Sequence, residues 1–109
     1  MLEALLGSEN KEKVLIYLYS REKGYAREIA DFFDISLTSV INQLKKLEAG
    51  NVIYMEQKGK TKEYRFNPRY PFLKELKIIL EKTLSFYPAD FIENLKYIRK
   101  RPRRSNKPL

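Results

Sequence analysis

The sequence predicts a mainly α-helical chain with one small β-ribbon, and three observations lead to this fold class. The chain has 109 residues, a length that suits one domain with a single modest core. Apolar residues recur at helical spacing in several segments, which are separated by caps and helix breakers. Residues 52–66 instead combine a β-favouring composition with alternation and a central glycine, which is the pattern of a hairpin.

The chain opens with a short apolar turn that precedes a long helix. Gly7 closes this turn, and Ser8 is a good N-cap for a helix over residues 9–20. The apolar stripe of that helix is wider than a one-sided surface helix needs, so we expect part of it to face a partner. The turn itself is formed by Leu2, Leu5 and Leu6.

Two further helices follow in close succession and predict a helix-turn-helix. The first covers residues 26–33 and ends at Asp34, one of the few non-glycine residue types that tolerate the left-handed backbone of a tight turn. Ser36 then caps a helix over residues 37–49, which the Gly50-Asn51 pair terminates.

A β-ribbon and two C-terminal helices complete the predicted elements. Strands over residues 52–55 and 61–66 flank a loop at residues 57–60. Pro71 opens a helix that extends to residue 84, and Pro88 separates it from a last helix over residues 89–100. We therefore expect a helix-turn-helix and ribbon unit in residues 1–70, covering and dimerising helices in residues 71–101, and a basic tail in residues 102–109.

The composition excludes several classes of function. The chain contains neither cysteine nor histidine, which removes thiolate or imidazole metal ligands, cysteine nucleophiles and histidine general bases. The acidic residues Glu28, Asp31 and Asp34 lack partnered bases or a phosphate-binding loop, so we predict that the chain is not an enzyme and binds no metal or cofactor. Its longest apolar run, residues 14–19, is far shorter than the roughly 20 residues of a membrane span. We expect a cytoplasmic protein.

The net charge of +8 is unevenly distributed along the chain. Residues 35–70 carry +4 and residues 94–109 carry +7, whereas residues 1–34 and 71–93 carry −2 and −1. A pI near 9.7 favours a polyanionic partner, with nucleic acid first and an anionic membrane surface second.

The helix over residues 37–49 has a polar surface without any acidic side chain. Its apolar residues gather on the opposite side, whereas Thr38, Asn42 and Lys45 lie together with Ser39 and Lys46 beside them. Hydroxyls and lysines contact phosphates, and asparagine can pair with adenine in two hydrogen bonds. A solvent-exposed helix rich in lysine and asparagine shows the same pattern, so the helix alone leaves both interpretations open.

The predicted ribbon adds a second basic feature directly after this helix. Lysines surround Gly59 at its tip, although lysines on an exposed edge strand also deter aggregation. The combination of helix, turn, helix and basic ribbon is more specific than either part. The basic residues of the ribbon are Lys58, Lys60, Lys62 and Arg65.

Residues 9–68 resemble the winged helix-turn-helix transcriptional regulators of the broad ArsR/MarR type from bacteria and archaea. The resemblance rests on residues 24–30, 35–40 and 44–50, on the Lys58-Gly59-Lys60 wing and on residues 64–68. It implies a recognition helix over residues 37–49 in the major groove of double-stranded DNA and a wing over residues 57–62 on the backbone or in the minor groove. The implied DNA contacts are Ser36, Thr38, Ser39, Asn42, Lys45, Lys46, Lys58, Lys60, Lys62 and Arg65.

The chain departs from the pattern of this family at several positions. Leu37 and Ile41 stand where many relatives have polar residues, Asn42 where arginine is frequent, and Asp34 where a turn glycine is usual. Base reading is therefore expected to rest on thymine methyl contacts and one asparagine. The cysteine and histidine ligands of the metal-sensing members are absent.

The resemblance also implies a homodimer, and the surplus of aromatic and apolar residues outside the helix-turn-helix agrees with one. The expected interface residues are Leu2, Leu5, Leu6, Leu76, Ile79, Leu80, Phe91 and Leu95.

The basic C-terminal tail, with Arg101, Arg103 and Arg104, is interpreted as a non-specific DNA arm. A solubilising end and a membrane-surface helix over residues 89–104 are the alternatives. The rival function for the whole chain is a winged-helix module that docks a protein through its C-terminal helices and does not read DNA.

Overall fold

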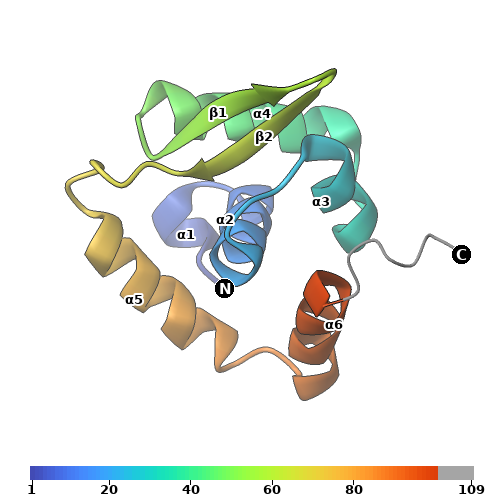
Figure 1. The fold of residues 1–109 in the computed structure, drawn as a ribbon. Helices are drawn as coiled ribbons and strands as arrows, with labels where there is room; N and C mark the ends of the chain where they lie inside the picture. The colour runs from blue at the N-terminus through green and yellow to red at the C-terminus, as the bar shows by residue number, and fades with distance from the viewer. Residues whose placement is uncertain (101–109) are drawn as a thin grey trace, which may run out of the picture.

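The computed structural model describes the backbone of residues 1–100 and the side chains of residues 1–95. The tail residues Arg101, Arg103 and Arg104 thus lie outside the described residues. The elements are α1 (Glu3–Leu6), α2 (Glu9–Arg21), α3 (Ala26–Phe33), α4 (Leu37–Ala49), β1 (Ile53–Lys58), β2 (Thr61–Phe66), α5 (Leu73–Leu84) and α6 (Ala89–Lys100). Helices surround α2, and the ribbon projects from one side of the body (Figure 1).

The predicted fold class is confirmed, and most helix bounds agree with the sequence pattern. One start differs, because Pro71 does not open a helix. Residues 71 and 72 form a turn, and α5 begins at Leu73 with Phe72 as its N-cap residue.

Helix α2 is the central element of the core. Val14, Leu15, Ile16, Tyr17 and Leu18 are all buried, and α2 contacts every other helix and β2. The wide apolar stripe is thus covered within one chain, and the expectation that part of it faces a partner is wrong for these five residues. A helix surrounded on all sides needs apolar residues around most of its circumference.

The turn between α3 and α4 forms as the sequence predicts. Asp34 has φ 56° and ψ 50°, the left-handed conformation that ends α3. Ser36 then caps α4, because its hydroxyl oxygen accepts a hydrogen bond of 3.0 Å from the Ser39 backbone N–H. At the far end of α4, Gly50 has an ordinary φ of −87°, and Asn51 takes the positive value of 63°.

The two strands of the ribbon pair in an antiparallel register that extends to the tip. Ile53 is opposite Phe66, and Lys58 is opposite Thr61. Only Gly59 and Lys60 remain as the loop, so the loop predicted at residues 57–60 is shorter than expected. The base of the ribbon is held by the segment before α3, because Gly24 and Tyr64 exchange two backbone hydrogen bonds of 3.0 and 2.9 Å.

The C-terminal helices close the core on the side away from α4. Leu80 of α5 and Leu95 of α6 are both buried in the cluster that contains α2. At the α3 side, Phe91 joins an aromatic group with edge contacts to Phe32 at 5.5 Å between ring centres, and Tyr87 lies 4.9 Å from Phe91. Since Phe91 and Leu95 pack inward, they are not available to a membrane surface. None of the described helices has the length and apolar character needed to cross a bilayer.

Candidate nucleic-acid interface

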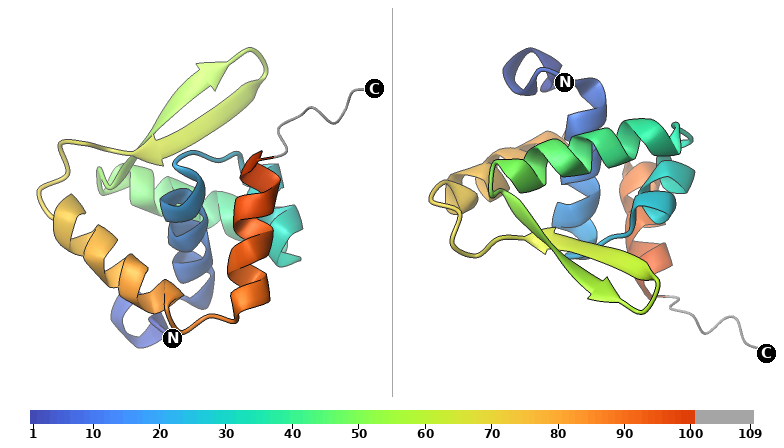
Figure 2. Two further views of the ribbon diagram at one scale, coloured as in Figure 1. Left: turned by 60° about the horizontal axis from the view of Figure 1, so that its bottom comes forward. Right: turned by 90° about the horizontal axis from the view of Figure 1, so that it is seen from above.

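Helix α4 and the ribbon lie side by side on one face of the molecule. Figure 2 shows this face from above, with α4 crossing it and the ribbon beside it, and its left view shows the ribbon tip extending away from the body. The recognition helix and wing predicted from the sequence therefore share one surface.

The polar surface of α4 is open to solvent. Thr38, Asn42, Lys45 and Lys46 are exposed, whereas Val40, Leu44 and Leu47 on the opposite side are buried in the core. The helical arrangement predicted from the sequence is thus confirmed. An α-helix with short polar side chains and lysines on its free surface has the size and chemistry that a major groove accepts.

Two serines of the predicted site serve mainly to begin the helix. Ser36 donates a hydrogen bond of 2.8 Å from its hydroxyl to the Ser39 hydroxyl oxygen and accepts one from the Ser39 backbone N–H. Ser36 is exposed and Ser39 is half-buried. The hydroxyl hydrogen of Ser39 stays available to an external acceptor.

The ribbon tip presents three exposed lysines. Gly59 has φ 62° at the first position of the loop, as a two-residue hairpin loop of type II′ requires. Lys60 lies in the loop and Lys62 on β2, and among the described residues neither has an acidic partner within ion-pair distance. Lys58 lies 3.8 Å from Glu56 in an exposed pair, which is worth little in water.

Arg65 is placed differently from the three lysines. Its Nε donates a hydrogen bond of 3.2 Å to Glu63 Oε1, and its side chain is half-buried at the base of the ribbon. Arg65 is therefore held within the chain and does not lie at the wing tip where the sequence places the basic group.

Glu63 joins the wing to the segment between α2 and α3, a role that the sequence does not reveal. The residue is only 2% exposed. Besides Arg65, it accepts a hydrogen bond of 3.3 Å from the Tyr25 hydroxyl and lies 3.7 Å from Lys23 Nζ. Burial raises the pKa of Glu63, but the Arg65 hydrogen bond and the nearby positive charges outweigh burial and hold this pKa below its usual value. The carboxylate therefore stays charged and fixes the wing base.

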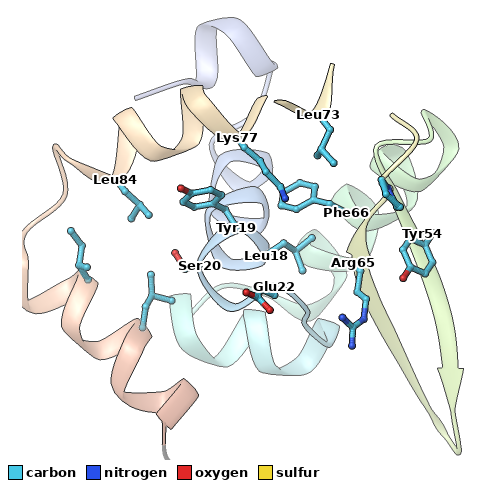
Figure 3. A pocket seen from close by; sticks show the side chains of 13 residues that line it. Leu18, Tyr19, Ser20, Glu22, Tyr54, Arg65, Phe66, Leu73, Lys77 and Leu84 are labelled. Carbon is cyan, nitrogen blue, oxygen red and sulfur yellow. The ribbon is translucent and has the colours of Figure 1, made fainter. Parts of the chain in front are cut away.

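A cavity of about 650 Å³ opens beneath the ribbon base, between α2, α5 and α6 (Figure 3). Its lining is mostly apolar and aromatic, with Glu22, Arg65 and Lys77 as the charged residues. The Lys77 amine lies 5.9 Å from the ring centre of Phe66. No lining residue belongs to α4 or to the wing tip, so the cavity is separate from the candidate DNA surface.

The residues predicted for a dimer interface fall into three groups. Leu80 and Leu95 are fully buried, so their burial within one chain assigns them to the core instead. Four others are half-buried and only Leu5 and Ile79 are exposed. The half-buried group consists of Leu2, Leu6, Leu76 and Phe91.

Within the residues that the structure describes, no group of three acidic side chains is arranged to hold a metal ion.

Comparisons with solved structures agree with this architecture. MepR, a transcription regulator of the Staphylococcus aureus multidrug efflux pump MepA, superposes with a TM-score of 0.59 at 19% identity, over 88% of this chain and 77% of that chain. A double mutant of ZitR from Lactococcus lactis gives 0.57 at 22% identity, over 83% and 68% of the two chains. The transcriptional regulator BldR from Sulfolobus solfataricus gives 0.53 at 17% identity, over 92% and 79%.

No family model matches the sequence, and a comparison with curated proteins finds no match either. At these identities the likeness to the solved structures concerns the fold. The winged helix-turn-helix architecture expected from residues 9–68 is thereby confirmed.

Proposed function

We propose that the chain is a sequence-specific, DNA-binding transcriptional regulator. The observation that carries this proposal is the exposed surface of α4, which is polar, basic and free of acidic groups, beside a wing whose tip holds Lys58, Lys60 and Lys62. On this proposal α4 enters the major groove, and residues 57–62 contact the backbone or the minor groove.

Within this surface, the side chains divide by chemistry into reading and positioning roles. Asn42 is the candidate for base reading, because its amide can donate to and accept from one adenine edge. Lys45, Lys46 and the wing lysines neutralise phosphates, which positions the protein without selecting sequence. Ser36, Thr38 and Ser39, near the N-terminus of α4, suit contacts to phosphate oxygens. Arg65 supports the wing through Glu63.

We further propose that two copies bind together in the prokaryotic cytoplasm, so that two α4 helices meet half-sites about one DNA turn apart. The regulators MepR and BldR share the fold, which supports a regulatory role over an enzymatic one. A protein-docking module that ignores DNA is the alternative, and it would leave the acid-free surface of α4 without a purpose.

The proposal is tested by selecting bound sequences from a random duplex pool at physiological salt. A specific regulator enriches one motif, and a dimer enriches it as an inverted repeat. Uniform retention of all sequences would indicate non-specific binding, and no retention would favour the docking module.

A further inference from the structure

The outward face of α5 carries large apolar side chains that the rest of the described chain leaves uncovered. Phe72, Ile78, Ile79 and Phe86 are 62%, 57%, 38% and 64% exposed. The opposite face of the same helix, with Leu80 and Thr83, is buried against the core. A contiguous apolar patch of this kind on a protein surface marks an interaction site.

Two opposite charges lie within this patch. At about 100° per residue, Glu75, Ile78, Ile79 and Lys82 all fall within roughly one third of the circumference of α5. Glu75 and Lys82 are both exposed, and neither forms an ion pair with another described residue.

The order of these residues is symmetric about the midpoint between Ile78 and Ile79. With a rise of 1.5 Å per residue, Glu75 lies about 5 Å before this midpoint and Lys82 about 5 Å after it. Phe72 and Phe86 flank the stripe about 10 Å from the midpoint on either side. The face is thus self-complementary for a second helix of the same sequence that runs antiparallel.

We propose that this face of α5 is a homodimer interface in which the two α5 helices pack antiparallel across a twofold axis between Ile78 and Ile79. Glu75 of each protomer then lies opposite Lys82 of the partner subunit. In an isologous interface each such contact occurs twice. This inference names the partner surface of the regulator proposed above, although the assembly itself can be tested without DNA.

The charge pattern selects a second copy as the occupant of this face. A parallel pair of α5 helices would set Glu75 against its own copy and Lys82 against its own copy, at an electrostatic cost. An unrelated partner would not require opposite charges at equal distances from one point. Of the interface residues expected from the sequence, only Ile79 belongs to this stripe.

The size of the stripe sets the strength of the dimer. Stable complexes usually bury about 800 Å² per partner, and one exposed face of a 12-residue helix offers less than that. The dimer is therefore concentration-dependent, and its exposed ion pairs weaken as salt is added.

Charge reversal tests both the interface and its antiparallel register. In Glu75→Lys each new lysine meets Lys82 of the partner subunit, and in Lys82→Glu each new glutamate meets Glu75 of the partner subunit. We expect each variant alone to dimerise about tenfold more weakly than the wild type, because two attractive pairs become repulsive. An equimolar mixture of the two variants restores both pairs and should recover the dimer.

Sedimentation velocity over a range of concentrations, without DNA, measures these states. Glu81→Lys is the matched control, since Glu81 is an exposed acid of α5 that lies outside the stripe, and Ile78→Asp tests the apolar part independently. Circular dichroism verifies that every variant is folded.

A wild type that stays monomeric at all concentrations would overturn the proposal. So would charge reversals that dimerise like the Glu81→Lys control, or a mixture no stronger than its components, because the dimer would then use another surface. A normal dimer that fails to enrich any DNA sequence would reject the proposed function and leave this interface standing.

Discussion

Tyr87 and Glu12 are joined by a hydrogen bond of 2.6 Å from the tyrosine hydroxyl to Glu12 Oε2, across 75 residues of sequence. Tyr87 lies between α5 and α6, and Glu12 lies in the first turn of α2. The Glu12 carboxylate is buried and also accepts a 2.6 Å hydrogen bond from the Leu2 backbone N–H. Burial raises the pKa of Glu12, but the Tyr87 and Leu2 hydrogen bonds outweigh it and keep this pKa below its usual value. A charged hydrogen bond therefore helps to fix the C-terminal helices on α2.

Removal of the Tyr87 hydroxyl tests this connection. Because a hydrogen bond to a charged group contributes about 1.5–3 kcal/mol, we expect Tyr87→Phe to lower the free energy of unfolding by that amount in urea titrations. Tyr54→Phe is the matched control, since Tyr54 is exposed. Equal midpoints for the two variants would mean that the hydrogen bond contributes nothing to stability.

Acid should destabilise the fold through its two buried carboxylates. Glu12 and Glu63 have a pKa below the ordinary 4.5 in the folded chain. Such groups stabilise the fold above the pKa of the unfolded chain, and their contribution is lost as the pH falls through the lower, folded value. We expect the urea midpoint to decline below about pH 4.5.

The double variant Glu12→Gln, Glu63→Gln provides the control for this pH dependence. It should be less stable at pH 7 and should lose less stability on acidification than the wild type. An unchanged slope between pH 5 and pH 3 would exclude these two carboxylates as the cause.

Asn42 and Lys60 should differ in what they contribute to DNA binding. Loss of a base-pairing side chain costs about 1–3 kcal/mol at the cognate site, whereas loss of a phosphate contact weakens all duplexes alike. We therefore expect Asn42→Ala to reduce the ratio of cognate to random binding and Lys60→Ala to leave that ratio unchanged. Competition titrations at one salt concentration measure both. Equal losses on cognate and random DNA for Asn42→Ala would remove its reading role.

Deletion of residues 102–109, which include Arg103 and Arg104, tests the basic tail. If these residues neutralise phosphates, the slope of log K against log salt should flatten by about 0.9 for each phosphate that the shortened chain leaves unneutralised. The preference for the cognate sequence should not change. A slope identical to that of the full chain would assign the tail to solubility alone.

Gly24 lies where a larger residue has no room. A Cβ at this position would come within 3.1 Å of Tyr17 Cε1 and 3.3 Å of Ile29 Cδ1, and the Tyr17 ring is itself held by edge contacts with Phe32 and Phe33. We expect Gly24→Ala to cost about 1–3 kcal/mol of unfolding free energy.

Gly50→Ala is the control for this steric effect. Gly50 has φ −87°, and the nearest heavy atom to an added Cβ would be 3.6 Å away. The variant should therefore be neutral or slightly stabilising, since alanine restricts the unfolded chain. Thermal unfolding of the two variants distinguishes steric crowding from a general effect of replacing glycine.

The sequence is informative wherever structure depends on neighbours along the chain. The bounds of α3 and α4, the left-handed turn at Asp34 and the Ser36 cap all follow from local patterns of polarity and capping. The buried side of α4, including Leu47, follows from helical periodicity. The outward position of Lys60 follows from the glycine beside it.

The features that sequence reasoning missed depend on residues far apart in the chain. Glu12 reads as an acid suited to a helix N-terminus, but Tyr87 makes it a buried acceptor. Glu63 and Arg65 read as ordinary ribbon charges, and only the approach of Tyr25 over β2 buries the carboxylate. The central position of α2 was missed for the same reason, because it depends on how α5 and α6 fold back.

The pairing of Gly24 with Tyr64 divides the ribbon into an anchored base and a free overhang. From Tyr64 to Lys60, four residues at about 3.3 Å each give an overhang of about 13 Å. Strand length thus sets the separation between the lysines at the tip and the side chains of α4. In relatives with this architecture, adding or removing one residue pair would shift that separation by about 3 Å and turn the outermost side chains to the other face. Wing length is therefore a heritable variable by which such proteins can change the spacing of their backbone and base contacts while α4 stays the same.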